Sequence, residues 1–453
     1  MGERDPEGAR KSSVLFKAVV QPLQDFFRLE AASGILLMCS AAIALGWANS
    51  PWRDSYTAIF EAPLTIGVGG SQVHFTVHHL INDGLMALFF FVVGMEIKRE
   101  LVVGELRSLS RALLPLVAAL GGMVVPAAVY VLLNRDGPGL KGWAIPMATD
   151  IAFCIGCLSL LKKRVPHALV VFVTALAIFD DMGGILVIAF FYGSGLHVSW
   201  LLGALAVTVG LFVLNRLRVV NGLAYGVGGV ALWYTLHHGG IHATIAGVIL
   251  GMMIPTRALR SSLEVLTQLH AHTENLLRQR RNEELDDAEV LSIEERMEDL
   301  ESPLNRFVHL LHPYVAFGIM PLFALANSGV SLAGVGLAEL KDPISLGAAL
   351  GLFLGKQLGI FLFVLLAVRL GLASMPGGAS RVKLYGVAVI AGIGFTVALF
   401  IAGLAFPEPS ILDRAKLGIL IGSLVSGVVG YLVLRFTSPV EEKPQAQALP
   451  AQV

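Results

Sequence analysis

Two adjacent aspartates, Asp180 and Asp181, stand inside the apolar stretch Ala177–Tyr192. They are the only Asp, Glu, Lys or Arg residues between Arg164 and Arg216. An ionised carboxylate in hydrocarbon costs about 2.5–3.5 kcal/mol on insertion scales, so two in a row are expensive for a membrane-spanning helix. A pair of solvated aspartates at a helix end is the simpler alternative, but apolar residues flank the pair on both sides. We therefore predict an ion or proton site inside a membrane.

Three other polar side chains lie in apolar stretches where they could contribute to such a site. Pro146 breaks the backbone ladder of one stretch, and Thr149 and Asp150 follow where a second half-helix would begin. A carboxylate there favours the positive end of a helix, so a simple N-cap is compatible, although a charged cap at this depth indicates function. Lys356 is the one charge inside a later stretch and lies too deep to reach the interface easily, so it needs a partner.

These residue types favour exchange of a small cation for protons. Adjacent residues of a helix point about 100° apart, so Asp180 and Asp181 face different directions. One can line a water-filled cavity while the other faces a neighbouring helix, where Lys356 is the obvious counter-charge. Two carboxylates, the Thr149 hydroxyl and freed backbone carbonyls would supply the oxygen ligands that a hard cation such as Na+ prefers. The same carboxylates bind protons as a coupled unit, so cation and proton compete, which suffices for exchange if the site faces one side at a time.

The elements that must position these side chains are membrane spans. The 453 residues are 55% hydrophobic and 15% charged, whereas a soluble protein would carry about a quarter charged residues. We predict an all-α polytopic membrane protein of about twelve spans. The spans start near residues 30, 80, 112, 143, 166, 198, 222, 241, 308, 344, 384 and 412. A net charge of zero gives no case for nucleic acid, and we expect no cofactor and no enzymatic activity.

Lys and Arg predict the orientation of the spans. They concentrate in the N-terminal tail and in the loops after spans 2, 4, 6 and 10, which the positive-inside rule places in the cytoplasm. Both termini, 1–29 and 437–453, are therefore expected there. Spans are expected over 30–255 and 307–436, separated by a loop at 256–306. Two amphipathic patterns in this loop, the second with a capping box at Ser292 and Glu295, predict a cytoplasmic helical pair with an accessory role.

Residues 62–77 alternate apolar and polar side chains around Gly69-Gly70 and predict a small extracytoplasmic β-hairpin. Because an exposed hairpin has free edges, it could pair with a second copy and form a homodimer. An isolated flap is the alternative. In the next span, Asp83 is either a helix cap or functional, and Glu96, Arg99 and Glu100 share a face that suits an ordinary ion-pair cluster as well as a functional one.

A second interruption follows Lys356, at Gly392-Ile-Gly394 with Thr396 just beyond. Interrupted helices at corresponding places in two halves of a chain indicate a midplane site in secondary transporters. Spans 3–5 and 10–12 are therefore the candidate repeats.

At these residues the chain resembles the NhaA-type sodium/proton antiporters, and the resemblance covers most of the chain. Its motifs are Asp180-Asp181, Ala148–Phe153, Gly355-Lys356, Ile241–Thr244, Asn82–Gly84, Glu96–Glu100 and the hairpin. The resemblance implies inverted repeats with two broken, crossing helices. It implies that Asp180 and Asp181 bind Na+ or Li+ and protons, that Lys356 pairs with one of them, and that Asp150 and Lys356 compensate the facing helix ends.

The resemblance also implies electrogenic exchange, with more protons than cations moved per cycle, in a bacterial inner membrane and with activation at alkaline pH. Candidates for pH sensing are Glu96, Arg99, Glu100, His242, His309 and His312. Two departures leave the pH profile open. The family has a Glu directly before the first His of a His-x-x-His-Pro run, where this chain has Val308, and the 256–306 loop is longer than in the family.

Two other functions compete with exchange. An intramembrane aspartyl protease also buries two aspartates, but it places them on separate helices within Tyr-Asp and Gly-x-Gly-Asp motifs, and this sequence contains neither. A sodium-coupled symporter of an organic solute would need a larger polar cavity, and these spans contain few uncharged polar residues. Membrane lipid is expected around any of these proteins.

Overall fold

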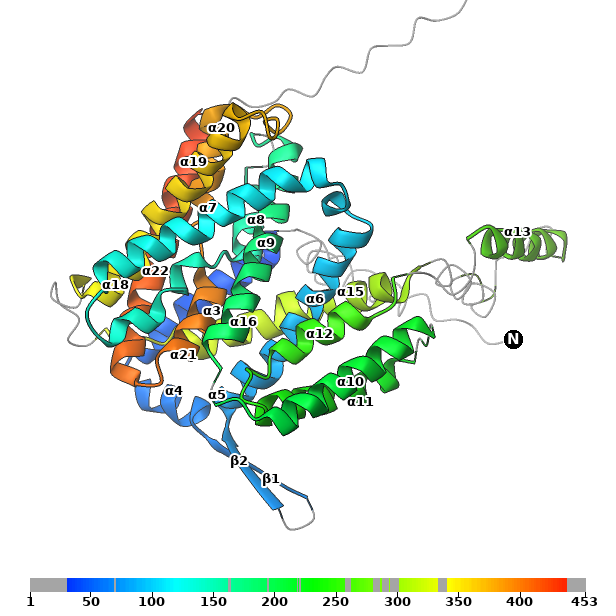
Figure 1. Ribbon diagram of the computed structural model, residues 1–453, viewed down its shortest axis with the longest axis horizontal. Helices are drawn as coiled ribbons and strands as arrows, with labels where there is room; N and C mark the ends of the chain where they lie inside the picture. Colours follow the sequence, from blue (N-terminus) through cyan, green and yellow to red (C-terminus); the bar gives the residue numbers. More distant parts are fainter. Residues whose placement is uncertain are drawn as a thin grey trace, which may run out of the picture. The chain divides into compact units, whose positions relative to one another are not determined.

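The computed structural model describes residues 31–68, 71–161, 164–193, 195–217, 219, 221–256, 262–279, 286, 293, 301–332 and 340–437. These residues are mostly helical and include a two-stranded sheet, as predicted. The chain forms two compact units, and Figure 1 labels their helices and strands. The first gathers Met1–Ser50, Leu113–Gly184 and Asn327–Val453, and the second gathers Pro51–Ala112 and Ile185–Ala326. Spans 10–12 belong to the first unit, and so do spans 3–5 apart from two helix ends, residues 109–112 and 185–191, which belong to the second.

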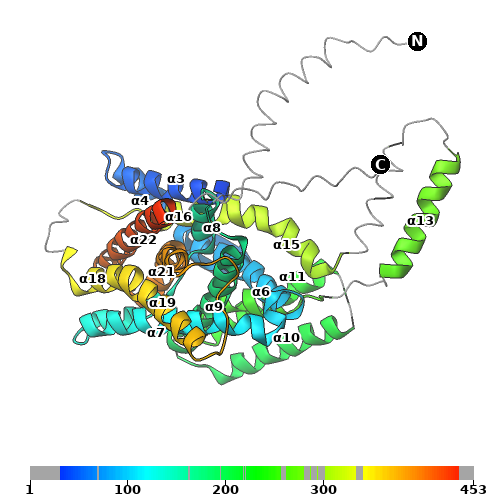
Figure 2. The ribbon, with the colours of Figure 1, turned by 90° about the horizontal axis from the view of Figure 1, so that it is seen from above.

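The first unit contains both helices that the sequence interrupts. Its elements are α3 (Ala31–Ala48), α7 (Leu109–Leu133), 3-10 turns at Pro138–Gly142 and Ile145–Met147, α8 (Ile151–Ser159), α9 (His167–Phe191), α18 (Pro343–Leu350), a π-helical turn (Gly351–Gly355), α19 (Lys356–Arg369), α20 (Arg381–Ile390), α21 (Phe395–Ala405) and α22 (Pro409–Thr437). The chain bends by 42° where Pro138–Met147 meets α8 and by 45° where α20 meets α21. Helices α3, α8 and α22 lie side by side (Figure 2).

The second unit carries the hairpin. Its elements are α4 (Arg53–Phe60), β1 (Pro63–Val68), β2 (Ser71–Thr76), α5 (Val77–His79), a π-helical turn (Leu80–Leu85), α6 (Met86–Val102), a 3-10 turn (Glu105–Arg107), α10 (Val198–Arg216), α11 (Gly222–His238), α12 (Ile245–Met253), α13 (Ser262–Gln279), α15 (Pro303–Tyr314), a π-helical turn (Val315–Ile319) and α16 (Met320–Asn327). The strands are antiparallel, with Pro63 opposite Thr76 and Val68 opposite Ser71. The hairpin projects beyond α4 and α5 (Figure 1).

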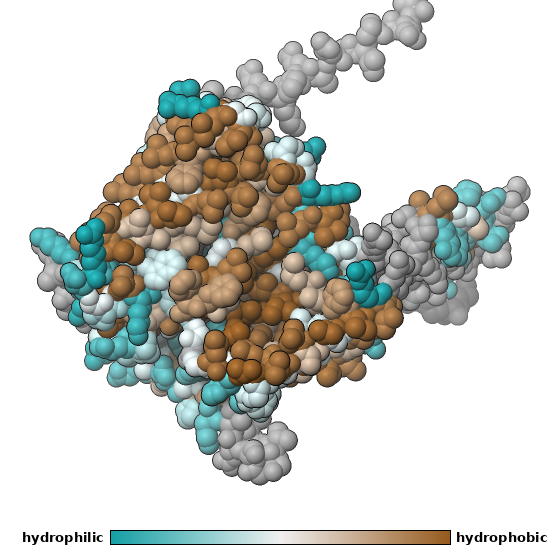
Figure 3. All heavy atoms as spheres, in the orientation of Figure 1, coloured by the Kyte–Doolittle hydropathy of each residue, from teal (hydrophilic) through white to brown (hydrophobic). Residues whose placement is uncertain are grey.

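The helices are suited to a membrane. In the part of the chain that the structure describes, seven helices are long and apolar enough to cross a bilayer. The number rises to as many as ten if each bent pair of helices is one span. Two further expected spans correspond to α11 and α12, which have 17 and 9 residues and fall below the length of that test. Apolar side chains cover the faces of α7 and α10 (Figure 3), where Leu132 and Leu202 are 58% and 60% exposed. Such exposure suits lipid better than water.

The loop predicted at 256–306 ends earlier than expected. Helix α15 begins at Pro303, inside that loop, because Ser302 caps it by accepting a hydrogen bond from the Asn305 amide at 3.3 Å. The first predicted amphipathic helix is present as α13. Most of the second one, with its Ser292 and Glu295 cap, lies outside the described residues, as do the tail 1–29, the hairpin tip 69–70 and residues 438–453.

Candidate functional site

The two interruptions of the first unit lie side by side. The Asp150 amide donates a hydrogen bond to the Ile393 carbonyl at 2.7 Å, so the extended residue before α8 pairs with the unwound residue before α21. Pro146 and the pair Gly392 and Gly394 explain locally why helical backbone stops at these places. Two helix N-termini consequently begin next to each other inside the unit.

Asp150 serves both of these helix N-termini. Its Oδ1 accepts from the Phe153 amide at 3.0 Å, and its Oδ2 accepts from the Thr396 amide at 3.1 Å and the Thr396 hydroxyl at 2.5 Å. The side chain is therefore the N-cap of α8 and also a cap for α21, whose own preceding residue is Gly394. Because both helix starts carry partial positive charge, one buried carboxylate balances two helix dipoles.

Asp180 and Lys356 form an ion pair in the same region. Lys356 Nζ lies 2.7 Å from Asp180 Oδ2, and both side chains are fully buried. The ammonium also donates to the Met147 carbonyl, at the last residue of the 3-10 turn before the α8 break. Lys356 follows the π-helical turn Gly351–Gly355, which rotates the start of α19 relative to a regular helix. The Lys356 ammonium therefore contacts both a carboxylate and the carbonyl end of a broken helix.

Thr149 connects this pair to the second interruption. Its hydroxyl lies 2.8 Å from Asp180 Oδ2 and 3.0 Å from the Ala391 carbonyl, and since it has one proton it donates to one of them at a time. Asp180 Oδ1 is buried and has no hydrogen-bond partner in the described part of the chain. Asp181 is also buried, at 6% exposure, one residue further along α9. An unsatisfied carboxylate oxygen beside a hydroxyl and unwound carbonyls is a position that a cation or a proton could occupy.

The described residues contain no group of three or more His, Cys, Asp or Glu side chains of the kind that holds a resident metal ion. The oxygens near Asp180 are instead one hydroxyl, carboxylates and backbone carbonyls. Oxygen ligands of this kind suit a hard cation.

The candidates for pH sensing all belong to the second unit, whereas Thr149, Asp150, Asp180, Asp181 and Lys356 belong to the first. His242 Nε2 lies 3.8 Å from Asp83 Oδ1, and its Nδ1 lies 2.8 Å from the Thr244 hydroxyl. Asp83 is inside the π-helical turn Leu80–Leu85 and is therefore not a helix cap.

The remaining candidates lie on α6 and α15. Glu96 is half-buried and interacts electrostatically with His312, Arg99 and Glu100. Glu100 has a structural contact as well, because its Oε2 accepts from the Glu105 amide at 3.1 Å. His309 is exposed and lies 3.4 Å from Glu301.

Sequence reasoning did not include Thr396 among the site residues. A threonine directly after a glycine-interrupted helix is a recognisable cap signal, so it could have been found. Ser423 Oγ accepts a hydrogen bond from the Phe395 amide at 3.2 Å. No pattern around Ser423 in the sequence of α22 predicts this contact. The Met147 and Ala391 carbonyls were expected only as unspecified backbone ligands.

Known proteins resemble the chain over nearly its whole length. The family model described as Na+/H+ antiporter 1 matches residues 24–434. The chain belongs to this antiporter family. It is 62% identical to "Na(+)/H(+) antiporter NhaA 1" of Myxococcus xanthus, over 94% of this chain and 95% of that protein. It is 60% identical to "Na(+)/H(+) antiporter NhaA" of Anaeromyxobacter sp., over 99% of both chains. A Koribacter versatilis antiporter of the same name is 47% identical over 94% of each chain.

Membership of the antiporter family agrees with the apolar helices and makes the chain a membrane transport protein. The relatives are named as transporters, not as proteases or other enzymes. The resemblance predicted from the motifs is therefore confirmed at the level of the family.

Proposed function

We propose that this antiporter exchanges Na+ or Li+ for protons, that Asp180 and Asp181, assisted by Thr149, bind the cation, and that Asp181 and the Lys356 partner of Asp180 exchange the protons. The observation behind the proposal is the unequal environment of the Asp180 carboxylate. One of its oxygens is held by Lys356 at 2.7 Å, while the other is buried and has no hydrogen-bond partner among the residues that the structure describes. A carboxylate in that position gains from binding a cation or a proton.

Competition at Asp180 couples the two cargoes. A Na+ ion and the Lys356 ammonium are both attracted to the same carboxylate, so arrival of the ion weakens the ion pair. Lys356 can then lose its proton, since a buried ammonium without a carboxylate partner is costly. Asp181 can exchange a second proton for the cation. Two protons for one Na+ would move net charge across the membrane, which makes the exchange electrogenic.

In the proposed site, fixed side chains and not a mobile counter-ion balance the partial charges at the ends of the broken helices. Asp150 balances the helix starts and Lys356 a carbonyl end, so small movements of α8 and α21 need not expose bare dipoles. Alternating access around this point suits an inverted repeat of spans 3–5 and 10–12. We propose twelve spans in a bacterial inner membrane, within 30–255 and, with the start of α15 as the structure has it, 303–436. Both tails and the loop between these two ranges would lie in the cytoplasm.

We propose that pH sensing depends on the second unit. Protonated His242 would attract Asp83, at 3.8 Å, and this attraction is lost as the imidazole gives up its proton with rising pH. Glu96, which interacts electrostatically with His312, Arg99 and Glu100, forms a second candidate group.

The test is dissipation of a pH gradient in proteoliposomes after addition of Na+, Li+ or K+, from mildly acidic to alkaline pH. Wild-type protein should respond to Na+ or Li+. The Asp181→Asn and Asp180→Asn variants should lose the response, because each lacks a carboxylate that binds cargo. Asp136→Asn is the matched control, since this aspartate is exposed in the same unit, and it should exchange normally.

A thermal unfolding transition must first establish that each variant is folded. Folded Asp181→Asn protein with undiminished Na+ response would contradict the assigned site. Folded wild-type protein without a response to any cation would contradict exchange itself.

A further inference from the structure

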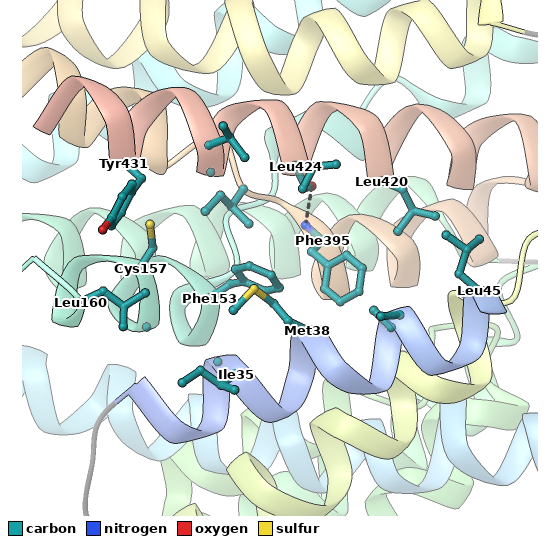
Figure 4. A pocket seen from close by; sticks show the side chains of 18 of the residues that line it. Ile35, Met38, Leu45, Phe153, Cys157, Leu160, Phe395, Leu420, Leu424 and Tyr431 are labelled. Carbon is teal, nitrogen blue, oxygen red and sulfur yellow. Dashed lines mark hydrogen bonds between the residues drawn. The ribbon is translucent and has the colours of Figure 1, made fainter. Parts of the chain in front are cut away.

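An apolar groove runs along the first unit between α3 and α22, with α8 and the residues flanking the start of α21 beneath it (Figure 4). Its volume is about 570 Å3, within the range of roughly 300–1,000 Å3 that ligand sites have. Helix α3 contributes Met38 and Ala42 to its wall, and α22 contributes Leu424, Gly427 and Val428. Leu424 and Val428 are 68% and 50% exposed although they are apolar, so the groove opens outward.

The length of the groove matches one leaflet of a bilayer. Its lining on α22 extends from Leu420 to Leu432, which at 1.5 Å per residue corresponds to about 18 Å. Half of a hydrocarbon core of about 30 Å is about 15 Å. An acyl chain lying parallel to α22 would therefore reach along the whole groove.

One end of the groove is polar and basic. Figure 4 places Tyr431, Cys157 and Leu160 at this end, and Leu45 and Leu420 at the other. One turn beyond Tyr431, the Arg435 guanidinium donates to the Tyr431 hydroxyl at 3.2 Å, and Arg164 donates to the Arg435 carbonyl at 2.5 Å. Within the described part of the chain, Arg435 has no carboxylate at ion-pair distance. Guanidinium groups at such a position suit a phosphate.

We propose that this groove binds an anionic phospholipid, with one acyl chain between α3 and α22 and the phosphate at Arg435, Arg164 and the Tyr431 hydroxyl. The proposal goes beyond exchange, because it assigns a lipid site that exchange does not require. Anionic lipid is favoured over a second protein copy because an apolar channel of one-leaflet length ends at two cationic side chains. The cytoplasmic orientation proposed above would place those arginines at the leaflet whose surface potential is negative.

The bound chain would lie next to the exchange site. Ile393 and Phe395 line the groove, and they flank Gly394, the residue directly before α21. The Ile393 carbonyl accepts the Asp150 amide, and the Phe395 amide donates to Ser423, which also lines the groove. An acyl chain would thus pack directly against the backbone that holds the two interruptions together.

The experiment is native mass spectrometry of the full-length protein in detergent, with equal amounts of phosphatidylglycerol and phosphatidylcholine of the same acyl chains. Wild type should retain phosphatidylglycerol preferentially. The Arg164→Gln/Arg435→Gln variant should retain it less, by roughly fivefold for each lost arginine, with phosphatidylcholine unchanged. Arg369→Gln is the matched control, because this arginine is exposed at the end of α19 in the same unit, and it should behave as wild type.

A second variant tests the acyl chain. Gly427→Leu should fill the groove and lower retention of both lipids, since a Cβ at Gly427 meets Ile393 at an ordinary 3.4 Å and the added atoms extend into the groove. Gly403→Leu, where a Cβ meets nothing within 4 Å, should retain lipid as wild type does. Equal phosphatidylglycerol retention in wild type and the double arginine variant would overturn the proposal. A dimer that disappears in Gly427→Leu would assign the groove to a second copy and overturn it too.

Discussion

Asp180 and Lys356 are stable inside the first unit because each charge has the other as its partner. Taking two ions out of water costs several kcal/mol for each, and this cost is recovered only with close geometry and further hydrogen bonds. Here the ions are 2.7 Å apart, Lys356 also donates to the Met147 carbonyl, and Thr149 lies beside the carboxylate. The arrangement therefore keeps both charges buried while leaving one oxygen of Asp180 unsatisfied.

Removing one partner should cost more than removing both. Lys356→Met leaves a buried carboxylate unpaired and should lower the free energy of unfolding by about 3–5 kcal/mol. The Asp180→Asn/Lys356→Met double variant should lose less than the sum of the two single variants, because no uncompensated charge is left. Unfolding in detergent, analysed as a double-mutant cycle, measures the coupling.

The exposed pair of Arg111 and Glu105, 2.9 Å apart, is the control for this cycle. Arg111→Met should cost less than about 1 kcal/mol, since an exposed ion pair is screened by solvent. Strict additivity of the Asp180 and Lys356 variants would argue against a stabilising ion pair.

Among the elements, α6 and α12 of the second unit pack through glycines. A Cβ at Gly251 would approach the Met95 amide to 2.7 Å, and a Cβ at Gly94 would approach the Val248 carbonyl to 2.6 Å. Real side chains do not tolerate such distances to backbone. Small residues let membrane helices approach closely where no hydrophobic effect drives them together.

Gly251→Ala should therefore force α6 and α12 apart and cost about 1–3 kcal/mol, as overpacking does. Gly226→Ala on α11 is the matched control, because a Cβ there meets nothing within 4 Å, and alanine is the better helix former. The midpoint of thermal unfolding should fall for the first variant and remain or rise for the second. Equal midpoints would mean that the two helices are less tightly packed than the backbone distances indicate.

For the whole molecule, the hairpin is the element most suited to join two copies. β1 and β2 pair only with each other in the sheet that the structure describes, so each has an edge that could add another strand. The proposed exchange site around Asp180 lies within one protomer, whereas pairing of these edges needs two.

Replacing residues 64–75 with a short Gly-Ser linker should convert a dimer to monomer while α4 and α5 remain connected. A flexible linker of this kind has no strand edge to offer. Light scattering of the detergent-solubilised protein, with the detergent contribution subtracted, measures the mass at several protein concentrations. Dimer that persists in the variant at low concentration would exclude the hairpin as the essential contact.

Local patterns were sufficient for the class of protein and for the positions of its breaks. Apolar runs predict spans because backbone in lipid must satisfy its own hydrogen bonds. Pro146 and the Gly392 and Gly394 pair predict interruptions because each acts on its own backbone. Buried charges identify the candidate site, since any ionisable group in an apolar span is costly wherever its partner lies.

The tertiary structure decided which of the buried polar side chains contact one another. Lys356 could have paired with Asp180 or Asp181, and the choice of Asp180, 176 positions away, depends on how α9 and α19 are rotated against each other. The local sequence around Asp150 predicts a cap for its own helix, and only the family resemblance implied a role at the facing helix end. The contact that caps α21, with Thr396 246 positions away, comes from the tertiary structure. No periodicity contains this information, because contacts between distant segments follow from packing of whole helices. The same packing places the carboxylates in one unit and the proposed pH-sensing residues in the other.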